Sequence, residues 1–390
     1  MIDVTSLLVA GIEFGSLPQQ LLNGILIGGV YALIALGYTM VYGVLRLINF
    51  AHGEVYMLGA YTALFVSWII YGRAQDPVTV VWYALPLMLL SAMTVCALIG
   101  IVLERFAYRP MRNQPRIASL ITAIGLSLLL QYGGQLFLPV SPAPNISGKV
   151  NPYRDNLTFY LTQPAPSLVR AADALKPEMD KAKAALDEQL KLEKDEFNLS
   201  DTGLALRKEF FERQSAYNKA QGEAQSSAIS ITLPKGQLIM FTVTLILMAI
   251  LRHIVLFTKS GRAMRAVSHD FDSAALMGIN VNKIVTLTFV LGSALAGAGA
   301  MMSATFISGV KIDTFFGLLP GVKAFVAAVL GGIGNIPGAV LGGILMGVAE
   351  SLVVWAGYDQ YKDAVAFLIL IVVLLFKPSG LLGSNKVEKV

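Results

Sequence analysis

Long apolar runs dominate this chain of 390 residues, and short polar breaks separate them. A membrane-spanning helix needs about 20 mostly apolar residues. Runs of that length, or slightly shorter, lie near residues 20–44, 55–71, 82–103, 117–139, 237–257, 284–307, 317–332, 339–356 and 362–376. The pattern predicts an all-α polytopic membrane protein with about eight or nine transmembrane helices, some of them broken.

The segment 142–235 interrupts this pattern. Prolines mark its beginning, and the run 171–196 has apolar residues at spacings of three and four, which is typical of an amphipathic helix. A second helical pattern covers 204–220, so we expect a helical hairpin. The chain thus divides into an N-terminal membrane half (1–141), a charged insert (142–235) and a C-terminal membrane half (236–390). The insert covers the outer mouth of a transport path or receives a partner, or it is a tolerated surface insertion with no transport role.

Basic residues outside the insert gather on one side of the predicted spans. Short loops rich in Lys and Arg stay in the cytosol, and the loops 104–116 and 258–283 hold most of the basic residues on this side. With nine crossings, this asymmetry predicts an extracytoplasmic N-terminus and a cytosolic C-terminus. The insert then lies outside the cytosol, and its own basic residues do not contradict this because long loops largely escape the charge rule.

The composition supports a membrane protein and excludes several kinds of site. Hydrophobic residues make up 55% of the chain and charged residues 14%, whereas a soluble domain carries about 25% charged residues. The single Cys96 excludes an intramolecular disulfide and a cysteine-based metal site, and the three histidines are scattered, so we predict no metal and no cofactor. The sequence has no G-x-x-x-x-G-K-[ST] motif, so any ATP that drives transport must bind to another polypeptide.

A polar break at 49–54 separates the first two apolar runs. It places His52 and Glu54 two residues apart, with a glycine between them. Polar groups in or beside hydrocarbon need protein or water partners, so we predict that Asn49, His52 and Glu54 belong to a substrate pathway. The alternative is a structural pair at the cytosolic edge, hydrogen-bonded to helix ends. No nucleophile or third group stands beside the pair, so we predict no catalytic residue.

A glycine-rich break at 331–338 separates two short apolar runs near the end of the chain. Interrupted short segments often mark substrate regions in transporters, because they free backbone groups beside a cavity. Lys323 lies within the first run and Asn335 within the break, so both are candidates for the pathway. The alternatives are that Lys323 snorkels to the outer interface and that most of the glycines serve close helix packing.

The loop 258–283 has the pattern of two short helices. Ser260 and Gly261 open the first helix, and Asp272 with Ser273 can cap the second, which Gly278 would end. A short helix that is apolar on one face and basic on the other suits docking into a groove of a soluble protein. The same pattern fits an interfacial helix that rests on anionic lipid equally well.

Several short blocks of sequence occur in order outside the insert. They are YTMVYG (38–43), INFAHGE (48–54), ERFAYRP (104–110), SGRAMR (260–265), MGIN (277–280), KAF (323–325), VLGGIG (329–334) and KPSGLLG (377–383). Together they resemble the branched-chain amino acid permeases of ABC transporters, of the LivH type. The segment 142–235 is much longer than the usual loop of that family at this place.

The resemblance implies an ATP-driven importer of leucine, isoleucine and valine in the bacterial inner (plasma) membrane, with a periplasmic N-terminus. Its partners would be a second related permease, two cytosolic ATP-binding subunits, a periplasmic substrate-binding protein and membrane lipid, but no nucleic acid. The chain itself would not be an enzyme. In that family the matching loop touches an ATPase, which favours docking. The residues assigned to this coupling are Gly261, Arg262, Arg265, Asp272, Ala275, Gly278 and Ile279.

Two other functions stay open. Near relatives of the family carry urea, short amides or other amino acids, so an ABC permease for one of these is an alternative. A secondary transporter or channel without an ATPase is an alternative from another class. We expect the binding protein to provide most of the selectivity, which would explain why the spans show no obvious amino-acid site of paired charges.

Overall fold

The computed structural model describes residues 16–72, 82–112, 114–139, 156–160, 162, 165–193, 201–226, 230–307 and 311–383. These residues form two compact units. One, the membrane unit, contains Gln20–Asn156 and Pro234–Val390, and the other, the insert unit, contains Leu157–Leu233 together with the start of the first helix. Residues 142–155, the first part of the predicted insert, lie outside the described residues.

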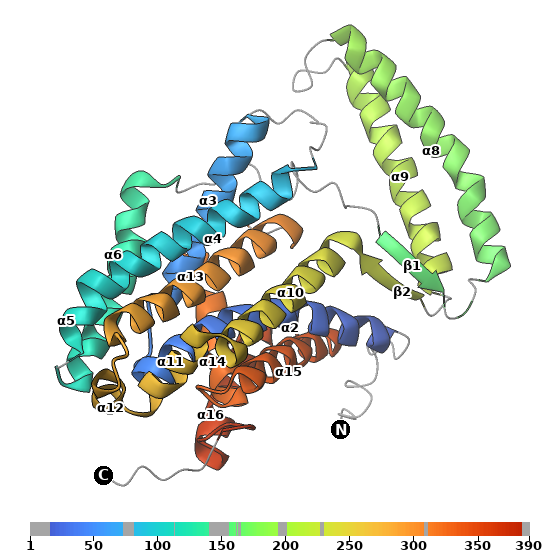
Figure 1. The fold of residues 1–390 in the computed structure, drawn as a ribbon. Coiled ribbons are helices and arrows are strands. Elements are labelled where there is room, and N and C mark those ends of the chain that lie inside the picture. Colours follow the sequence, from blue (N-terminus) through green and yellow to red (C-terminus); the bar gives the residue numbers. More distant parts are fainter. Residues whose placement is uncertain are drawn as a thin grey trace, which may run out of the picture. The chain divides into compact units, whose positions relative to one another are not determined.

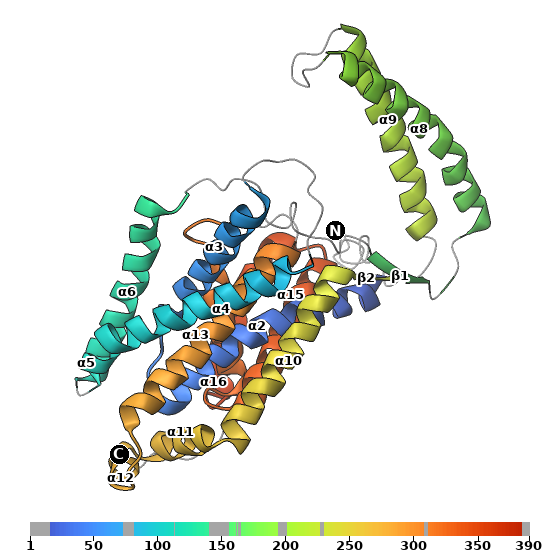
Figure 2. The same ribbon diagram turned by 45° about the horizontal axis from the view of Figure 1, so that its top comes forward.

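The membrane unit is built from helices (Figure 1). In chain order they are α2 (Leu17–Leu45), α3 (His52–Tyr71), α4 (Ala84–Leu103), the π-helical η2 (Glu104–Tyr108), α5 (Arg109–Met111), α6 (Arg116–Phe137), α10 (Lys235–Phe257), α11 (Lys259–His269), α12 (Phe271–Leu276), α13 (Val281–Phe306), α14 (Leu318–Gly331), α15 (Ile336–Trp355), the 3₁₀-helical η3 (Asp359–Tyr361) and α16 (Lys362–Phe376). The helices α4, α13 and α10 run side by side in Figures 1 and 2.

Each of the nine predicted apolar runs forms a helix. Among the described residues, 7 helices are long and apolar enough to cross a membrane. The other two runs form the shorter helices α14, with 14 residues, and α16, with 15. At 1.5 Å per residue, α14 is about 21 Å long, which is less than the roughly 30 Å of a hydrocarbon core. The structure confirms an all-α polytopic membrane protein with broken segments.

The helix α2 is the most buried of the seven long apolar helices. Two of its glycines lie directly against the backbone of α15. A Cβ atom on Gly24 would lie 2.7 Å from the Cα atom of Val348, and one on Gly28 would lie 2.7 Å from the Cα atom of Ile344. Small residues allow such close approach of helix backbones in lipid. Residue numbers fall along α15 as they rise along α2, so the two helices are antiparallel.

The starts of two helices, α3 and α14, lie against each other in the membrane unit. The first residue of α3, His52, packs against Gly37 in the interior of α2, where a Cβ atom would lie 2.3 Å from Nε2 of the imidazole. The start of α14 meets the start of α3, because a Cβ atom on Gly53 would lie 2.7 Å from the carbonyl oxygen of Gly317. The N-termini of the two broken segments are therefore neighbours.

The insert unit is a helical hairpin above a small sheet. The helices α8 (Pro166–Glu193) and α9 (Asp201–Ser226) pack along each other in Figures 1 and 2. The strands β1 (Asn156–Tyr160) and β2 (Ser230–Pro234) form a two-stranded sheet. Of the apolar stripe that the periodicity of α8 predicts, Ala182 and Leu186 are buried, and Leu175 and Met179 are half-buried.

The packing of α2 on α15 predicts the effect of one methyl group. We expect Gly28→Ala to lower the midpoint of thermal unfolding of the purified protein by several degrees, because overpacking costs about 1–3 kcal/mol. Gly125→Ala in α6 is the matched control, since nothing lies within 4 Å of a Cβ atom there. Equal unfolding midpoints for the two variants would contradict close contact between α2 and α15.

Candidate functional site

Three of the predicted pathway residues lie together at the start of α3. Asn49, His52 and Glu54 are 2%, 1% and 1% exposed. The side-chain oxygen of Asn49 accepts a hydrogen bond of 2.6 Å from the hydroxyl of Tyr108 in η2. One carboxylate oxygen of Glu54 accepts a hydrogen bond of 3.2 Å from the hydroxyl of Ser127 in α6. The break at 49–54 therefore joins α3 to two other parts of the membrane unit.

These three side chains are not fully satisfied by hydrogen bonds. Nδ2 of Asn49, Nε2 of His52 and Oε2 of Glu54 are buried and have no hydrogen-bond partner among the described residues. A buried polar atom without a partner costs about 1–3 kcal/mol. Such atoms are rare in folded proteins and are candidates for contact with water, an ion or a transported solute.

Lys323 lies in an ionic cluster that joins four helices. Its ammonium is 2.8 Å from Oε1 of Glu350 in α15 and 2.6 Å from Oδ1 of Asp363 in α16. The hydroxyl of Tyr31, in α2, donates a hydrogen bond of 2.8 Å to the other carboxylate oxygen of Glu350. Lys323 and Glu350 are each 7% exposed. Lys323 itself belongs to α14, so the cluster fixes α2, α14, α15 and α16 to one another.

The spans therefore contain one set of paired charges that the sequence analysis did not predict. Lys323 was predicted, but its partners Glu350 and Asp363 were not. Glu350 lies in the apolar run 339–356 and Asp363 at the start of the next run. An ionisable residue within a span needs a partner, so these two carboxylates were available in the sequence as partners for Lys323.

Asn335 has a different position from the other predicted pathway residues. It caps α15, where its Oδ1 accepts a hydrogen bond of 3.2 Å from the backbone N–H of Gly338. Its Nδ2 donates a hydrogen bond of 2.7 Å to the carbonyl oxygen of Leu382. The structure places Asn335 at the turn after α14, at the end of that helix opposite to Lys323. It brings Asn335 together with none of the other four candidates.

The first helix of the predicted loop, α11, is fixed to the end of α10. The N-cap hydroxyl of Thr258 accepts a hydrogen bond of 3.1 Å from the backbone N–H of Gly261. A Cβ atom on Gly261 would lie 2.2 Å from the carbonyl oxygen of Val255. Arg265 donates hydrogen bonds to the last carbonyls of α10, those of Val255 and Leu256. Gly261 and Arg265 thus hold the corner between α10 and α11.

The second helix, α12, is capped by Asp270 and not by Asp272 with Ser273 as predicted. The carboxylate of Asp270 accepts hydrogen bonds from the hydroxyl and backbone N–H of Ser273 and from the backbone N–H of Asp272. These bonds lower the pKa of Asp270. Asp270 is extended, as an N-cap residue is, whereas the other two already belong to the helix.

The tip of this loop, residues 275–278 at the end of α12, exposes two large apolar side chains. Leu276 is 88% exposed and Met277 is 82% exposed. The predicted residues Arg262, Asp272 and Ala275 are also exposed, Ile279 is half-buried and Gly278 reverses the chain with a φ of 82°. Leu276 and Met277 were not predicted as contact residues, although Met277 begins the MGIN block. A soluble partner would find an apolar contact here.

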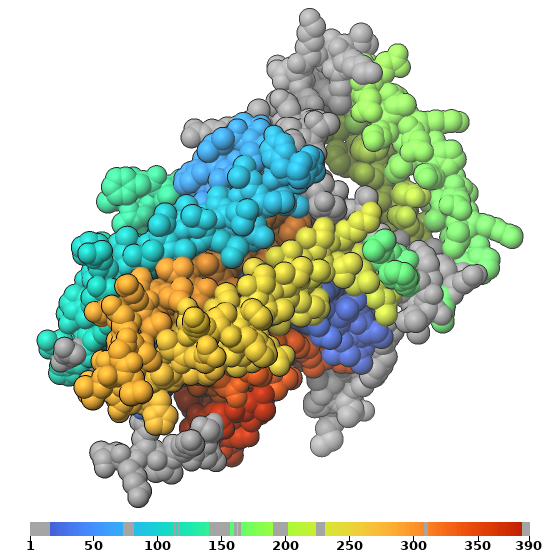
Figure 3. Space-filling model, in the orientation of Figure 1, coloured from blue at the N-terminus to red at the C-terminus, as the bar shows by residue number. Residues whose placement is uncertain are grey.

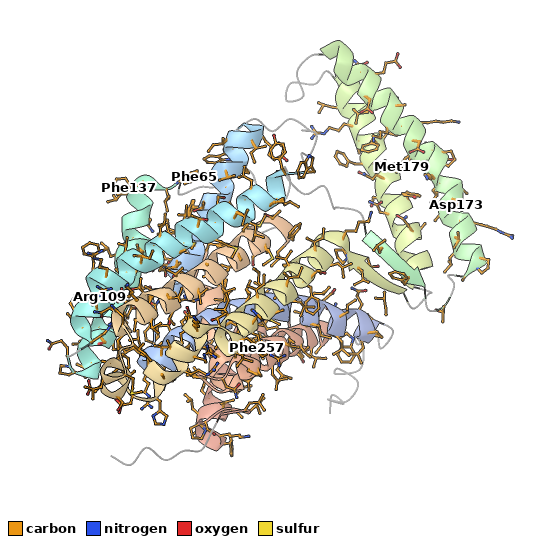
Figure 4. The ribbon with its side chains drawn as sticks, viewed as in Figure 1. Phe65, Arg109, Phe137, Asp173, Met179 and Phe257 are labelled. Atoms are coloured by element: carbon orange, nitrogen blue, oxygen red, sulfur yellow. The ribbon has the colours of Figure 1, made fainter. Side chains whose placement is uncertain are left out.

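A buried carboxylate connects the start of α13, which follows the tip, to the end of α4. Glu104, in η2, is fully buried and pairs with Arg109 and Arg112. Figure 4 marks Arg109 beside the end of α4. The hydroxyl of Thr286 in α13 donates a hydrogen bond of 2.8 Å to Glu104, and Arg112 donates one of 2.7 Å to Asn282. The first turns of α13, which directly follow the tip, are thereby tied to η2 and α5.

The sequence matches a known family over most of its length. Residues 20–374 match the family described as "Branched-chain amino acid transport system / permease component". The chain is 38% identical to the high-affinity branched-chain amino acid transport system permease protein BraD of Pseudomonas aeruginosa over 376 residues, which cover 95% of this chain and 97% of BraD. It is 35% identical to the corresponding permease protein LivH of Escherichia coli over 372 residues, again 95% and 97% of the two chains.

A more distant relative matches only part of the chain. The autoinducer 2 import system permease protein LsrC of Escherichia coli is 29% identical over 160 residues, which cover 39% of this chain and 46% of LsrC. No solved structure matches the chain significantly.

The ionic cluster predicts a large difference between two lysines. We expect Lys323→Met to destabilise the purified protein by about 3–5 kcal/mol, because it leaves a buried carboxylate without its partner. Lys362→Met is the matched control, since Lys362 forms an exposed pair with Asp359 that is worth at most about 1 kcal/mol.

Thermal unfolding of both variants in the same detergent checks this prediction. The double variant with Lys323→Met and Glu350→Met should recover part of the lost stability, because the uncompensated charge of Glu350 is then removed. Equal unfolding temperatures for the two single variants would show that the cluster does not stabilise the membrane unit.

Proposed function

The chain belongs to the branched-chain amino acid transport permease family, and from this premise we propose that it is the permease subunit of an ATP-driven importer of leucine, isoleucine and valine. The observation that carries the proposal is the 38% identity with BraD, which covers 97% of that permease. The buried polar groups at the start of α3 and the broken helix α14 are consistent with a transport path through the membrane unit.

The proposed partners are those that the family implies, and the missing phosphate-binding loop supports separate ATP-binding subunits. The sequence has no phosphate-binding loop, so two ATP-binding subunits would supply the ATPase, and this chain would not be an enzyme. A second related permease would complete the membrane part, and a periplasmic binding protein would deliver the substrate. We place the complex in the bacterial inner membrane, with the N-terminus in the periplasm and the C-terminus in the cytosol, on the distribution of basic residues.

Coupling would run through the exposed tip after α12. An ATP-binding subunit that moves Leu276 and Met277 pulls directly on α13, because Asn280 is already the N-cap of that helix. The hydrogen bonds of Glu104 then carry the displacement to η2 and the end of α4. The corner held by Gly261 and Arg265 carries it to α10. Substrate would pass along Asn49, His52, Glu54 and Lys323 as the two permeases alternate between outward-open and inward-open states.

Other substrates and another class of transporter remain as alternatives. The partial match to LsrC, whose name refers to autoinducer 2 import, illustrates that permeases with related sequences serve different solutes. Urea, short amides or other amino acids would keep the same architecture and partners. A secondary transporter would differ from all of these, because the purified chain alone would catalyse flux in liposomes.

The test of the proposed function is the uptake of labelled leucine by cells with and without this gene. We expect uptake that requires the gene, is competed by isoleucine and valine, and stops when ATP is depleted. Uptake that is unchanged without the gene would refute the substrate, and uptake that survives ATP depletion would refute the ATP-driven mechanism.

The coupling role predicts the effect of charges at the tip. We expect Leu276→Asp and Ala275→Arg to reduce leucine uptake tenfold or more, because hot-spot contacts of soluble partners contribute about 2 kcal/mol or more. Both side chains are exposed, so the folded permease should be produced at the normal level. Copurification of the ATP-binding subunits measures the docking directly.

Gln114→Asp is the matched control for these variants. Gln114 is exposed between α5 and α6 and lies outside the α11–α12 segment. Loss of uptake in this control, or normal copurification of the ATP-binding subunits with Leu276→Asp, would exclude the tip as the docking site.

The polar break at the start of α3 predicts a second transport phenotype. Glu54→Gln keeps the size of the side chain and its contact with Ser127 but removes the charge. We expect slower uptake at normal expression if Glu54 faces the transported solute. Ser127→Ala, which removes only the partner hydroxyl, is the control for the hydrogen bond. Unchanged uptake with Glu54→Gln would assign the break a structural role.

A further inference from the structure

The π-helical segment η2 has its two buried side chains in contact with different parts of the membrane unit. Glu104 and Tyr108 are the buried residues of η2, with exposed fractions of 0% and 1%. Glu104 contacts the start of α13, and Tyr108 reaches the polar break before α3. Figure 3 shows α4, which leads into η2, in light blue beside α13 in orange. The proposed transport mechanism uses Glu104 but gives Tyr108 no role.

Glu104 holds η2 to the segment that follows the tip. One of its carboxylate oxygens accepts a hydrogen bond of 2.8 Å from the hydroxyl of Thr286, in the second turn of α13. The same hydroxyl oxygen accepts a hydrogen bond of 3.2 Å from Arg109, and Arg109 and Arg112 both pair with the carboxylate. Separating a buried charge from its partners is strongly unfavourable. A displacement of the first turns of α13 therefore takes η2 with it.

Tyr108 connects the other end of η2 to the polar break. Its hydroxyl donates a hydrogen bond of 2.6 Å to Oδ1 of Asn49, and its ring packs on that of Phe289 in α13, with the ring centroids 5.1 Å apart. The backbone carbonyl of Asn49 accepts a hydrogen bond of 3.1 Å from the N–H of His52, the first residue of α3. Tyr108 thus contacts α13 with its ring and the start of α3 through its hydroxyl.

The winding of η2 allows both contacts to form at once. The backbone N–H of Arg109 bonds to the carbonyl oxygen of Glu104, five residues earlier, whereas an α-helix forms this bond after four residues. An α-helical turn would rotate Tyr108 relative to Glu104, so only one of the two contacts could keep its present geometry. π-Helical turns inside α-helices are rare and occur frequently at functional sites. The unusual winding is therefore a second, independent observation at the same place.

We propose that Tyr108 is a positioning residue for transport, which links the tip to the polar break through η2. The inference rests on the proposed function, since it needs a partner that moves the tip. A displacement of α13 moves Glu104 and Phe289 together, so η2 shifts as one element. Tyr108 then moves the amide of Asn49 and, through the bond to His52, the start of α3. The buried polar atoms of Asn49 and His52 that have no partner among the described residues are thereby turned toward the solute or away from it as the tip moves.

Hydrogen–deuterium exchange of the purified full-length chain tests this link without substrate or partner subunits. Thr286→Val removes the hydroxyl that bonds to Glu104, and the exchange of the backbone amides of residues 52–55 is measured at the start of α3. We expect this exchange to become about fivefold faster or more, because coupling between two sites commonly changes an equilibrium by roughly 5–150-fold. In Tyr108→Phe the same amides should already exchange faster, and adding Thr286→Val should then have no further effect.

Tyr61→Phe and Thr242→Val are the matched controls. The hydroxyl of Tyr61 bonds to the carbonyl oxygen of Pro139, and that of Thr242 bonds to the carbonyl oxygen of Leu238 within α10. Each control thus loses one hydroxyl hydrogen bond outside the link, and Thr286→Val should still act in the Tyr61→Phe background. Thr286→Ser keeps the hydroxyl and should exchange like the natural sequence, which separates loss of the bond from loss of packing.

Three results of this experiment would overturn the proposal. The first is unchanged exchange at the start of α3 in Thr286→Val. The second is an effect of Thr286→Val that persists in the Tyr108→Phe background, because the link would then bypass Tyr108. The third is an equal change with Thr242→Val, because any lost hydroxyl would then have the same effect.

Reconstituted complexes separate a positioning role from a merely structural one. With Tyr108→Phe we expect the amount of leucine transported per ATP hydrolysed to fall about fivefold or more. Copurification of the ATP-binding subunits and the KM for the loaded binding protein should stay normal. A structural role would lower uptake and hydrolysis together, and an unchanged ratio would overturn the proposal. If the complex with the natural sequence carries no leucine, the proposed substrate is wrong, whereas the exchange experiment still decides the role of Tyr108.

Discussion

The burial of Lys323 depends on the two carboxylates and the tyrosine that surround it. Lys323 lies between Glu350 and Asp363, and the hydroxyl of Tyr31 donates a hydrogen bond to the second carboxylate oxygen of Glu350. The cluster contains two carboxylates and one lysine. One of the carboxylates, that of Asp363, lies in the first turn of α16, where the positive end of the helix dipole favours a negative group. Each group comes from a different helix, so the position of one helix fixes those of the other three. This constraint holds the broken helix α14 in the middle of the membrane unit.

Close backbone packing and the ionic cluster depend on each other. Glycines bring α2 against α15, and only at this separation does Tyr31 reach Glu350. The start of α14 packs in turn against Gly53 at the start of α3. This contact links α14, which carries Lys323, to α3, which carries the polar residues of the break. Small residues here serve the arrangement of charges as much as they serve packing.

Hydropathy was sufficient to locate the nine helices that the apolar runs form, because a span needs a continuous apolar run whatever its neighbours are. The pairing of charges was not predictable in the same way, since Lys323 and its partners come together only through the return of α15 along α14. The N-cap of α12 was misplaced because Asp270 and Asp272 are equally good caps in sequence, and only the extended backbone of Asp270 distinguishes them. The exposure of Leu276 and Met277 is likewise a property of the turn at Gly278 and not of the residues. The matching blocks predicted the family correctly, since seven of the eight lie within the residues that the family match covers.

The strands β1 and β2 give the insert a clean boundary. They pair with each other, so the chain leaves for α8 and returns from α9 at one place. A gene could lose or gain the hairpin by exchanging it for a tight turn, with no change in the register of the spans. The same boundary makes the hairpin a natural place to graft a rigid marker for electron microscopy, where a small membrane protein otherwise gives images too featureless to align.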